Sequence, residues 1–166
     1  YRLLTQIPTL SFSISATTRG QREGEKDRKD YYFLTVNDFR EKIAEKAFVE
    51  YEMVYKGKYY GTLKSELERI WREDRFPLRV VDVVGARSLK EQFGNAALAL
   101  FIQPPSLEAL KERLQLRKSE NATSLQERIE KARQEMNHAN QFDHTVVNDD
   151  LERAVYECVS LIKDFI

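Results

Sequence analysis

The sequence predicts an α/β fold, in which helices flank a parallel core sheet, with a small β-rich insertion. Segments with strand patterns alternate with segments of helical periodicity along most of the chain, which favours parallel strands joined by helices. Residues 31–61 break this alternation, because short strands follow one another there with one helix between them. The length of 166 residues suits one domain, or one core with an inserted subdomain.

The first third of the chain predicts strands separated by a polar loop. Residues 10–15 alternate apolar and polar side chains, which is the period of a strand. Residues 16–29 mix arginine and lysine with acidic residues and contain two glycines, which indicates a loop. Residues 31–34 form a short aromatic strand, and Thr35 is placed to cap the helix that follows.

The middle of the chain predicts a hairpin, a helix and two buried strands. Residues 47–54 are extended, and residues 56–58 turn the chain back on itself. Thr62 begins the next helix. Residues 80–85 and 97–102 are rich in apolar side chains, and the first of these runs is β-branched, as is typical of a strand buried on both faces.

The last third predicts helices around one more strand. The Pro-Pro-Ser sequence at 104–106 ends the second buried strand and caps a helix. Residues 117–123 are polar, and a helix follows over 125–136. Residues 144–147 predict a short strand, and residues 151–166 carry apolar side chains at helical spacing.

Composition excludes several classes of protein. Lys plus Arg and Asp plus Glu are both 27, so no global positive field exists to attract nucleic acid or an anionic membrane. The apolar run at 96–102 is too short to span a bilayer. The single cysteine, Cys158, cannot form an internal disulfide. These observations argue against nucleic-acid and membrane partners, and we further expect a cytoplasmic protein that is monomeric or weakly dimeric.

The loop after the first strand contains a candidate anion site. Arg19 and Arg22 are three residues apart, hydroxyl side chains precede them, and Tyr31 follows. Guanidinium groups bind phosphate oxygens in pairs, and a phenol adds a further donor. A solvated loop of mixed charge is the alternative, and composition alone favours it.

Glu50 is a candidate reader of a planar base. It lies among apolar residues of an expected strand. A carboxylate in a partly dry site can accept two N–H donors from one edge, and guanine offers such an edge at N1 and N2 whereas adenine does not. A glutamate that faces solvent is the alternative.

Three further charged residues are candidates. Asp82 lies in the expected buried strand, where an acid must be paired or must face a ligand at the strand end. A structural hydrogen bond explains it equally well. Arg117 and Arg128 flank a polar segment, and arginines on a mobile segment can close over phosphates. Arginines on an ordinary helix surface are the alternative.

In order and spacing these stretches together resemble the guanylate kinase family from Ser11 to the C-terminus. The motifs that carry the resemblance are Ser15-x-x-Thr18-Arg19-x-x-Arg22-x-Gly24-Glu25, Asp30-Tyr31-x-Phe33, Phe48-Val49-Glu50, Tyr59-Tyr60-Gly61-Thr62, Val81-Asp82-Val83-Val84-Gly85, Pro104-Pro105-Ser106, Arg113-Leu114-x-x-Arg117, Arg128-Ile129 and Val146-Val147-Asn148-Asp149-Asp150-Leu151.

The resemblance implies an enzyme that converts GMP to GDP with ATP and Mg²⁺, on a P-loop kinase-like core. It implies a core of residues 1–30 and 63–166, a helical lid near 113–130, and a GMP-binding subdomain over 31–62. A guanylate kinase-like module that binds proteins and has lost catalysis is the competing hypothesis. Such a module need not retain Glu50 or the lid arginines, which this chain has.

The resemblance also assigns roles to individual residues, and it implies no residue as a metal ligand. Those implied to bind GMP are Ser15, Arg19, Arg22, Tyr31, Glu50, Tyr60, Thr62 and Asp82. Those implied to bind ATP are Arg117, Arg128, Asn148 and Asp149. Those implied to be catalytic are Arg22, Arg117 and Arg128.

The chain departs from the family pattern in three places. The Gly-rich phosphate loop is absent from the sequence, and residues 1–6 read as the end of a helix. We therefore expect roughly two dozen further residues before Tyr1: a strand, a loop of the Gly-x-x-Gly-x-Gly-Lys-Ser/Thr kind, and most of a helix. Val80 stands where the family usually has aspartate, and residues 118–120 are Lys-Ser-Glu where Gly-Thr-Asp/Glu is more usual.

Overall fold

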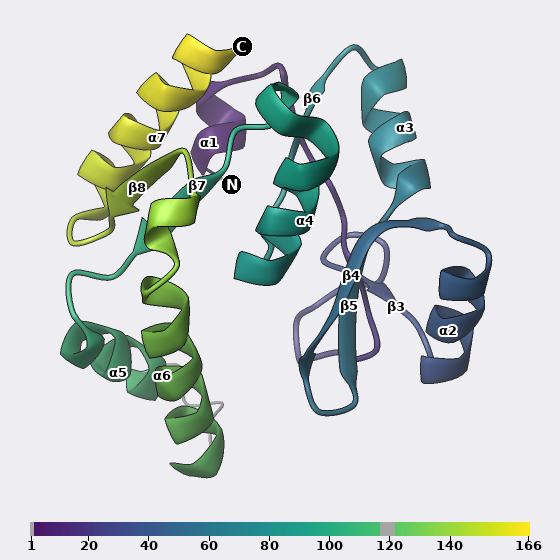
Figure 1. The fold of residues 1–166 in the computed structure, drawn as a ribbon, viewed down its shortest axis with the longest axis horizontal. Helices are drawn as coiled ribbons and strands as arrows, with labels where there is room; N and C mark the ends of the chain where they lie inside the picture. The colour runs from purple at the N-terminus through teal and green to yellow at the C-terminus, as the bar shows by residue number, and fades with distance from the viewer. Residues whose placement is uncertain (1, 117–121) are drawn as a thin grey trace. The chain divides into compact units, whose positions relative to one another are not determined.

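A computed structural model describes residues 2–116 and 122–166. The chain divides into two compact units, Tyr1–Gly94 and Asn95–Ile166 (Figure 1). Helices and parallel strand pairs occur in both, so the α/β class predicted from the sequence is confirmed.

The first unit contains a parallel pair of strands and the helices next to it. It opens with α1 (Arg2–Gln6), the helix end expected there, and β1 (Leu10–Phe12). Strand β1 pairs with β6 (Phe76–Leu78) in parallel, with Leu10 opposite Phe76. Helix α3 (Lys64–Arg72) leads into β6. The chain continues through α4 (Val83–Phe93) into a short 3₁₀ turn, η1 (Gly94–Ala96).

The predicted β-rich insertion is a sheet of four described strands in the order β3-β2-β5-β4. Its strands are β2 (Ala16–Thr17), β3 (Tyr32–Phe33), β4 (Phe48–Tyr55) and β5 (Lys58–Leu63). Strands β4 and β5 form the predicted antiparallel hairpin, and Gly57 adopts φ +73° in its turn. Strand β2 is antiparallel to β5 and parallel to β3, so it joins the loop that follows it to this sheet.

Helix α2 (Val36–Ala44) supplies part of the core of this sheet. It begins as predicted at Thr35, whose hydroxyl accepts the Asp38 N–H while the Asp38 carboxylate accepts the Thr35 N–H. This reciprocal capping satisfies donors that the first turn would otherwise leave unpaired. Phe39 is fully buried and stacks on Phe48, with ring centroids 4.4 Å apart.

The predicted strand over residues 80–85 is wrong. Helix α4 begins at Val83, and the Asp82 carboxylate caps it by accepting the Gly85 N–H at 2.9 Å. Val80 precedes the cap and is 78% exposed. The β-branched run is therefore divided by a helix start, because an aspartate three residues before a helical N–H satisfies that donor.

The predicted helix start at Thr62 is also wrong. Thr62 is the penultimate residue of β5, and α3 begins at Lys64. Leu63 occupies the N-cap position without a side-chain cap. The Thr62 hydroxyl donates instead to Glu50 across the sheet at 2.7 Å. A long-range partner therefore uses the hydroxyl that local pattern assigned to capping.

The second unit contains a parallel pair with three helices among its described residues; their course is drawn in Figure 1. Strand β7 (Leu100–Gln103) pairs with β8 (His144–Val147), with Leu100 opposite His144. The helices are α5 (Leu107–Leu116), α6 (Ala122–Met136) and α7 (Leu151–Phe165), and η2 (Ala139–Gln141) is a 3₁₀ turn.

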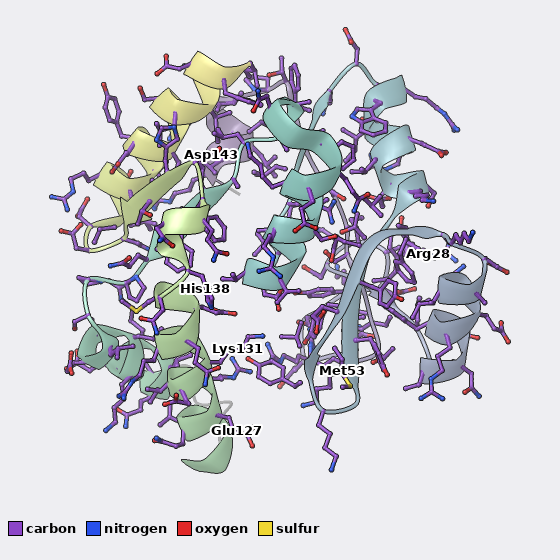
Figure 2. The ribbon with its side chains drawn as sticks, viewed as in Figure 1. Arg28, Met53, Glu127, Lys131, His138 and Asp143 are labelled. Carbon is purple, nitrogen blue, oxygen red and sulfur yellow. The ribbon has the colours of Figure 1, made fainter. Side chains whose placement is uncertain are left out.

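The predicted strand over residues 97–102, buried on both faces, is wrong in part: β7 covers Leu100–Gln103, and Ile102 is 49% exposed. Other predicted features of this unit are confirmed. The Ser106 hydroxyl accepts the Ala109 N–H at 3.1 Å near the start of α5. Cys158 is buried on the inner face of α7. Figure 2 shows Glu127 and Lys131, four residues apart, projecting from α6. In the part of the chain that the structure describes, no helix has both the length and the apolar character needed to cross a membrane.

Candidate functional site

The arginine-containing loop is anchored to the four-stranded sheet at its start. The Thr17 hydroxyl donates to the Tyr59 carbonyl at 3.0 Å and accepts the Arg19 N–H at 3.1 Å. The Thr18 hydroxyl accepts the Tyr59 N–H at 2.9 Å. Strand β2 pairs with β5 immediately before these contacts. The backbone at Arg19 is therefore fixed relative to β5, although the loop beyond it lacks regular structure.

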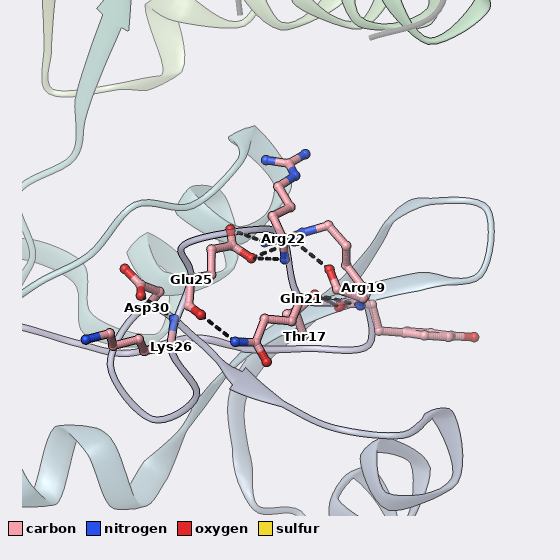
Figure 3. Close-up of polar contacts among 9 residues, drawn as sticks. Thr17, Arg19, Gln21, Arg22, Glu25, Lys26 and Asp30 are labelled. Carbon is pink, nitrogen blue, oxygen red and sulfur yellow. Dashed lines mark hydrogen bonds and ion pairs between the residues drawn. The ribbon is translucent and has the colours of Figure 1, made fainter. Parts of the chain in front are cut away.

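Glu25 holds this loop closed on itself (Figure 3). Its carboxylate accepts two hydrogen bonds from the Arg19 guanidinium, at 2.8 and 2.9 Å, and one from the Arg22 N–H at 2.8 Å. The hydrogen bonds with Glu25 raise the pKa of Arg19, and the same bonds lower the pKa of Glu25. The Arg19 guanidinium and the Arg22 N–H that bind the Glu25 carboxylate are donors of the kind that bind a phosphate.

Three of the predicted phosphate-binding residues lie together. The Arg19 guanidinium carbon is 5.1 Å from the centroid of the Tyr31 ring. The Tyr31 and Tyr60 rings meet edge to face, with centroids 6.2 Å apart. Arg19, Tyr31 and Tyr60 come from the loop, the residue before β3, and β5 respectively. The Arg22 side chain is exposed and extends away from the Glu25 carboxylate (Figure 3).

Glu50 is buried, so the alternative of a solvent-facing glutamate is wrong. It lies on β4 opposite Thr62 on β5, and its Oε1 accepts the Thr62 hydroxyl at 2.7 Å. The same Oε1 accepts a hydrogen bond from Arg79 Nη2 at 2.8 Å. Since both of these bonds among the described residues use Oε1, Oε2 is placed to accept donors from a ligand.

Asp82 and Gly85 border the Glu50 carboxylate. A Cβ atom at Gly85 would lie 3.1 Å from Glu50 Oε2 and 3.4 Å from Asp82 Oδ1. The absence of a side chain at Gly85 therefore leaves room at Oε2. Ser15 lies just before β2, and its carbonyl accepts the Tyr32 N–H at 2.9 Å. The backbone at Ser15 is thus held by β3.

The remaining predicted residues belong to the second unit. Asn148 and Asp149 follow β8, and Arg113 donates to their carbonyls at 2.8 and 3.5 Å. Asp149 accepts the Asp150 N–H at 2.6 Å, which lowers the pKa of Asp149, and it also pairs with Arg153. Arg128 is half-buried on α6. Arg117 lies outside the described residues.

Sequence reasoning missed the roles of Glu25 and Arg79. A signal existed for Arg79, because this cation stands next to the apolar pair Val80-Val81 and a buried cation requires an anionic partner. Glu25 was part of a recognised motif, but its position within a mixed-charge loop gave no indication of which cation it would pair with. Among the described residues, no group of three or more His, Cys, Asp or Glu side chains could hold a metal ion.

The sheet β3-β2-β5-β4 carries both the arginine-containing loop and a buried acceptor carboxylate, and these features together suit the class of proteins that bind a phosphorylated planar ligand. The family model described as guanylate kinase matches residues 2–165, and the chain belongs to that family. The resemblance predicted from the motifs is confirmed.

Individual relatives agree with this assignment. A guanylate kinase of Porphyromonas gingivalis is 48% identical over 166 residues, which cover 99% of this chain and 88% of that protein. A guanylate kinase of Chlorobium chlorochromatii is 48% identical over 164 residues, covering 99% and 86%. The crystal structure of guanylate kinase from Anaplasma phagocytophilum superposes with a TM-score of 0.82 at 27% identity, covering 98% of this chain and 80% of that one.

Proposed function

We propose that the protein transfers the γ-phosphoryl group of ATP to GMP, forming GDP and ADP. The observation that carries this proposal is the convergence of Arg19, Tyr31 and Tyr60, with the guanidinium 5.1 Å from one ring and the two rings 6.2 Å apart. Their polar ends supply a cation and two phenols, which together suit a phosphate monoester. Membership of the guanylate kinase family supports the same reaction.

Arg19, Arg22, Tyr31 and Tyr60 are the proposed ligands of the GMP phosphate. The Glu25 carboxylate currently occupies the donors of Arg19, so the phosphate would replace it there. Arg22 is exposed and extends outward, and it would add a second guanidinium to the same anion. Two guanidinium groups at the GMP phosphate would also neutralise much of its negative charge.

Ser15, Glu50 and Thr62 are the proposed readers of guanine, and Asp82 is proposed to lie beside the base. Glu50 Oε2 would accept donors from the N1 and N2 edge. The Thr62 hydroxyl has one proton, which it now donates to Glu50 at 2.7 Å. It would have to leave Glu50 to donate to a carbonyl of the base.

Arg117, Arg128, Asn148 and Asp149 are proposed to serve the ATP side of the reaction. The two arginines would stabilise charge on the transferred phosphoryl group, which is where cations contribute most in phosphoryl transfer. Asn148 and Asp149 would border the adenine ring. The Arg113 hydrogen bonds to their carbonyls would keep that loop in place.

Mg²⁺ is proposed to enter with ATP. This ion commonly keeps its waters and binds through substrate phosphates with few protein ligands. The described residues contain no preformed cluster of acidic, histidine or cysteine side chains, which is compatible with that mode, and none of them is assigned as a ligand. The ion would neutralise phosphate charge, while the arginines of this chain orient the reacting groups.

The residues of this chain need not include a strong general base. The phosphate of GMP is already an anion at neutral pH and can attack the γ-phosphoryl group in line. The contribution of the protein is then to bring two anions together, since arginines lower their repulsion and exclude water. Catalysis would therefore depend on cation placement more than on proton transfer.

The finer proposals concern organisation and location. Residues 31–62 are proposed as the GMP-binding subdomain and the remainder as core, with a lid near 113–130. We propose a cytoplasmic enzyme, monomeric or weakly dimeric, without nucleic-acid or membrane partners. The equal numbers of acidic and basic residues, 27 each, support the last point.

Steady-state kinetics of the full-length protein test the proposed roles. Arg22→Ala should raise the KM for GMP strongly, because its phosphate contact forms in the ground state. Arg128→Ala should lower kcat by roughly 10²–10⁴, because a lid arginine acts on transition-state charge. Arg133→Ala, at an exposed position on the same helix as Arg128, is the matched control and should resemble the wild type.

Two outcomes would contradict the proposal. If Arg128→Ala leaves kcat unchanged, Arg128 does not act on the transferred group. If the wild-type protein binds GMP but does not turn it over with Mg²⁺ and ATP, the protein is a binding module rather than an enzyme.

A further inference from the structure

The partner of Glu50 is an unusually placed arginine. Arg79 lies between β6 and α4, and its side chain is 8% exposed, while the Glu50 side chain is 7% exposed. Their ion pair, from Nη2 to Oε1, is 2.8 Å long. Within the described residues, the Nε and Nη1 atoms of Arg79 are buried and have no hydrogen-bond partner.

This arrangement is poorly explained by stability. Burying a charged pair removes both groups from water, and the cost is recovered only when the remaining donors are also satisfied. Arg79 leaves two donor atoms unsatisfied, so an apolar side chain of similar length would serve a merely structural role as well or better. The pair therefore calls for an explanation in terms of what Glu50 does.

Asp82 is a second acidic group close to Glu50, so a cation at this site offsets negative charge. Asp82 Oδ1 and Glu50 Oε2 both lie within 3.4 Å of one point, the Cβ position of Gly85. The neighbouring strand β5 contributes the neutral hydroxyl of Thr62. A carboxylate from β4 and one from the start of α4 thus border the same point. The buried Arg79 guanidinium, 2.8 Å from Glu50 Oε1, places a positive charge beside these two acids.

We propose that Arg79 is a positioning residue that keeps Glu50 ionised and oriented, and thereby sets the preference of the site for guanine over adenine. The inference rests on the proposed function, since it assumes that Glu50 reads the base of the phosphoryl acceptor.

The chemical reason lies in the two forms of a carboxyl group. An ionised carboxylate only accepts hydrogen bonds, which matches the N1–H and N2–H donors of guanine. A neutral carboxyl group both donates and accepts, which matches the N1 acceptor and the N6–H donor of adenine. A glutamate that takes up a proton therefore loses its selectivity. Although burial lowers the pKa of Arg79, a guanidinium remains protonated at neutral pH.

The test compares GMP with AMP across pH in the full-length protein. The ratio of kcat/KM for GMP to that for AMP is measured from about pH 6 to 9, because both substrates carry the same phosphate and its own titration cancels in the ratio. The wild-type ratio should change little with pH. In Arg79→Met the ratio should fall roughly 10- to 100-fold at the acid end and recover toward the alkaline end, as Glu50 loses its proton.

Three further variants separate positioning from general damage. Arg79→Lys keeps a cation and should retain a nearly flat profile. The double variant Glu50→Gln with Arg79→Met cannot titrate at position 50, so its low ratio should not depend on pH. Arg72→Met, at an arginine 80% exposed on α3, is the matched control and should behave as the wild type. Thermal unfolding of every variant identifies those that fail to fold.

The inference is overturned if folded Arg79→Met shows a GMP-to-AMP ratio that equals the wild-type ratio, or one that is lowered by the same factor at every pH. It is likewise overturned if the pH dependence persists in the double variant. Failure of the proposed function gives a different result, because the wild-type protein would then not phosphorylate GMP at all.

Discussion

Two buried glutamates of the first unit have similar partners and different degrees of satisfaction. Glu50 and Glu66 each accept a hydroxyl hydrogen bond of 2.7 Å, from Thr62 and Tyr32 respectively. Each also pairs with an arginine. Arg79 lies 2.8 Å from Glu50, and Arg69 lies 3.1 Å from Glu66.

The difference is in the remaining lone pairs. Glu66 uses both oxygens, because Oε1 accepts from Tyr32 and Arg69 Nε, while Oε2 accepts from the Ile14 N–H and Arg69 Nη2. Glu66 thereby joins the end of β1 to β3 and α3. At Glu50 the bonds among the described residues converge on Oε1. A fully partnered buried acid such as Glu66 therefore holds structure, whereas a partly partnered one such as Glu50 is suited to a ligand.

Glu50→Gln should have the largest effect among the variants that test this difference between the two glutamates. The amide presents an N–H₂ donor where guanine also presents donors. Transition-state stabilisation should therefore weaken by about 2–4 kcal/mol, which lowers kcat/KM for GMP roughly 30- to 1000-fold. Steady-state kinetics of the folded variant measures this loss, and Tm should fall as well because the buried Arg79 guanidinium loses its anionic partner. An unchanged kcat/KM for GMP would remove Glu50 from the site.

Glu66→Gln should lower stability without the kinetic loss. The amide cannot replace the charge-assisted bonds with Arg69, so unfolding should require about 2–3 kcal/mol less. The estimate is moderate because Arg69 is 41% exposed and can return to water. Urea unfolding measures the change, and the KM for GMP should stay near the wild-type value. A large KM effect with unchanged stability would reverse the roles assigned to the two acids.

The pH dependence of stability tests the structural role of Glu66. Burial alone would raise the pKa of Glu66, but the hydrogen bonds from Arg69, Tyr32 and the Ile14 N–H lower it overall. A depressed folded-state pKa means that the contribution of Glu66 is present above its unfolded pKa of about 4.3 and is lost as pH falls through the folded value. The stability difference between wild type and Glu66→Gln should therefore shrink below about pH 4. Urea midpoints measured from neutral to acid pH check this, and a constant difference would contradict it.

Val80→Asp should have the smallest effect. The sequence predicted a buried strand at Val80, where a new acid would cost several kcal/mol. The structure leaves Val80 78% exposed, so an aspartate there would be solvated, and the free energy of unfolding should change by about 0.5 kcal/mol or less. Thermal unfolding of the wild type and of Val80→Asp decides whether residue 80 is buried or exposed.

The features that sequence predicted well depend on local chemistry. The cap at Thr35, the turn at Gly57 and the amphipathic face that buries Cys158 each follow from residues a few positions apart. The motif order also identified the family and the residues that meet at Arg19 and Tyr31.

The features that sequence missed depend on partners far along the chain. Arg79 finds Glu50 across 29 positions, and Tyr32 finds Glu66 across 34. Asp82 was assigned to a strand because its β-branched neighbours outweighed its capping ability in a local pattern. Thr62 was assigned to a cap because its partner on β4 could not be seen locally. Hydroxyl and carboxyl groups are the hardest to assign from sequence, since each has several possible partners of similar energy.

The Arg19–Glu25 contact has a consequence for which anions the loop can retain. Glu25 is tethered six residues from Arg19, so it competes with any incoming ligand at a high effective concentration. A singly charged carboxylate or sulfonate would offer Arg19 little more than Glu25 already does. A phosphate monoester, nearly doubly charged at neutral pH, gains more from the same fork and from Arg22. Singly charged metabolites would therefore fail to displace Glu25 from Arg19, whereas phosphate monoesters would displace it and bind.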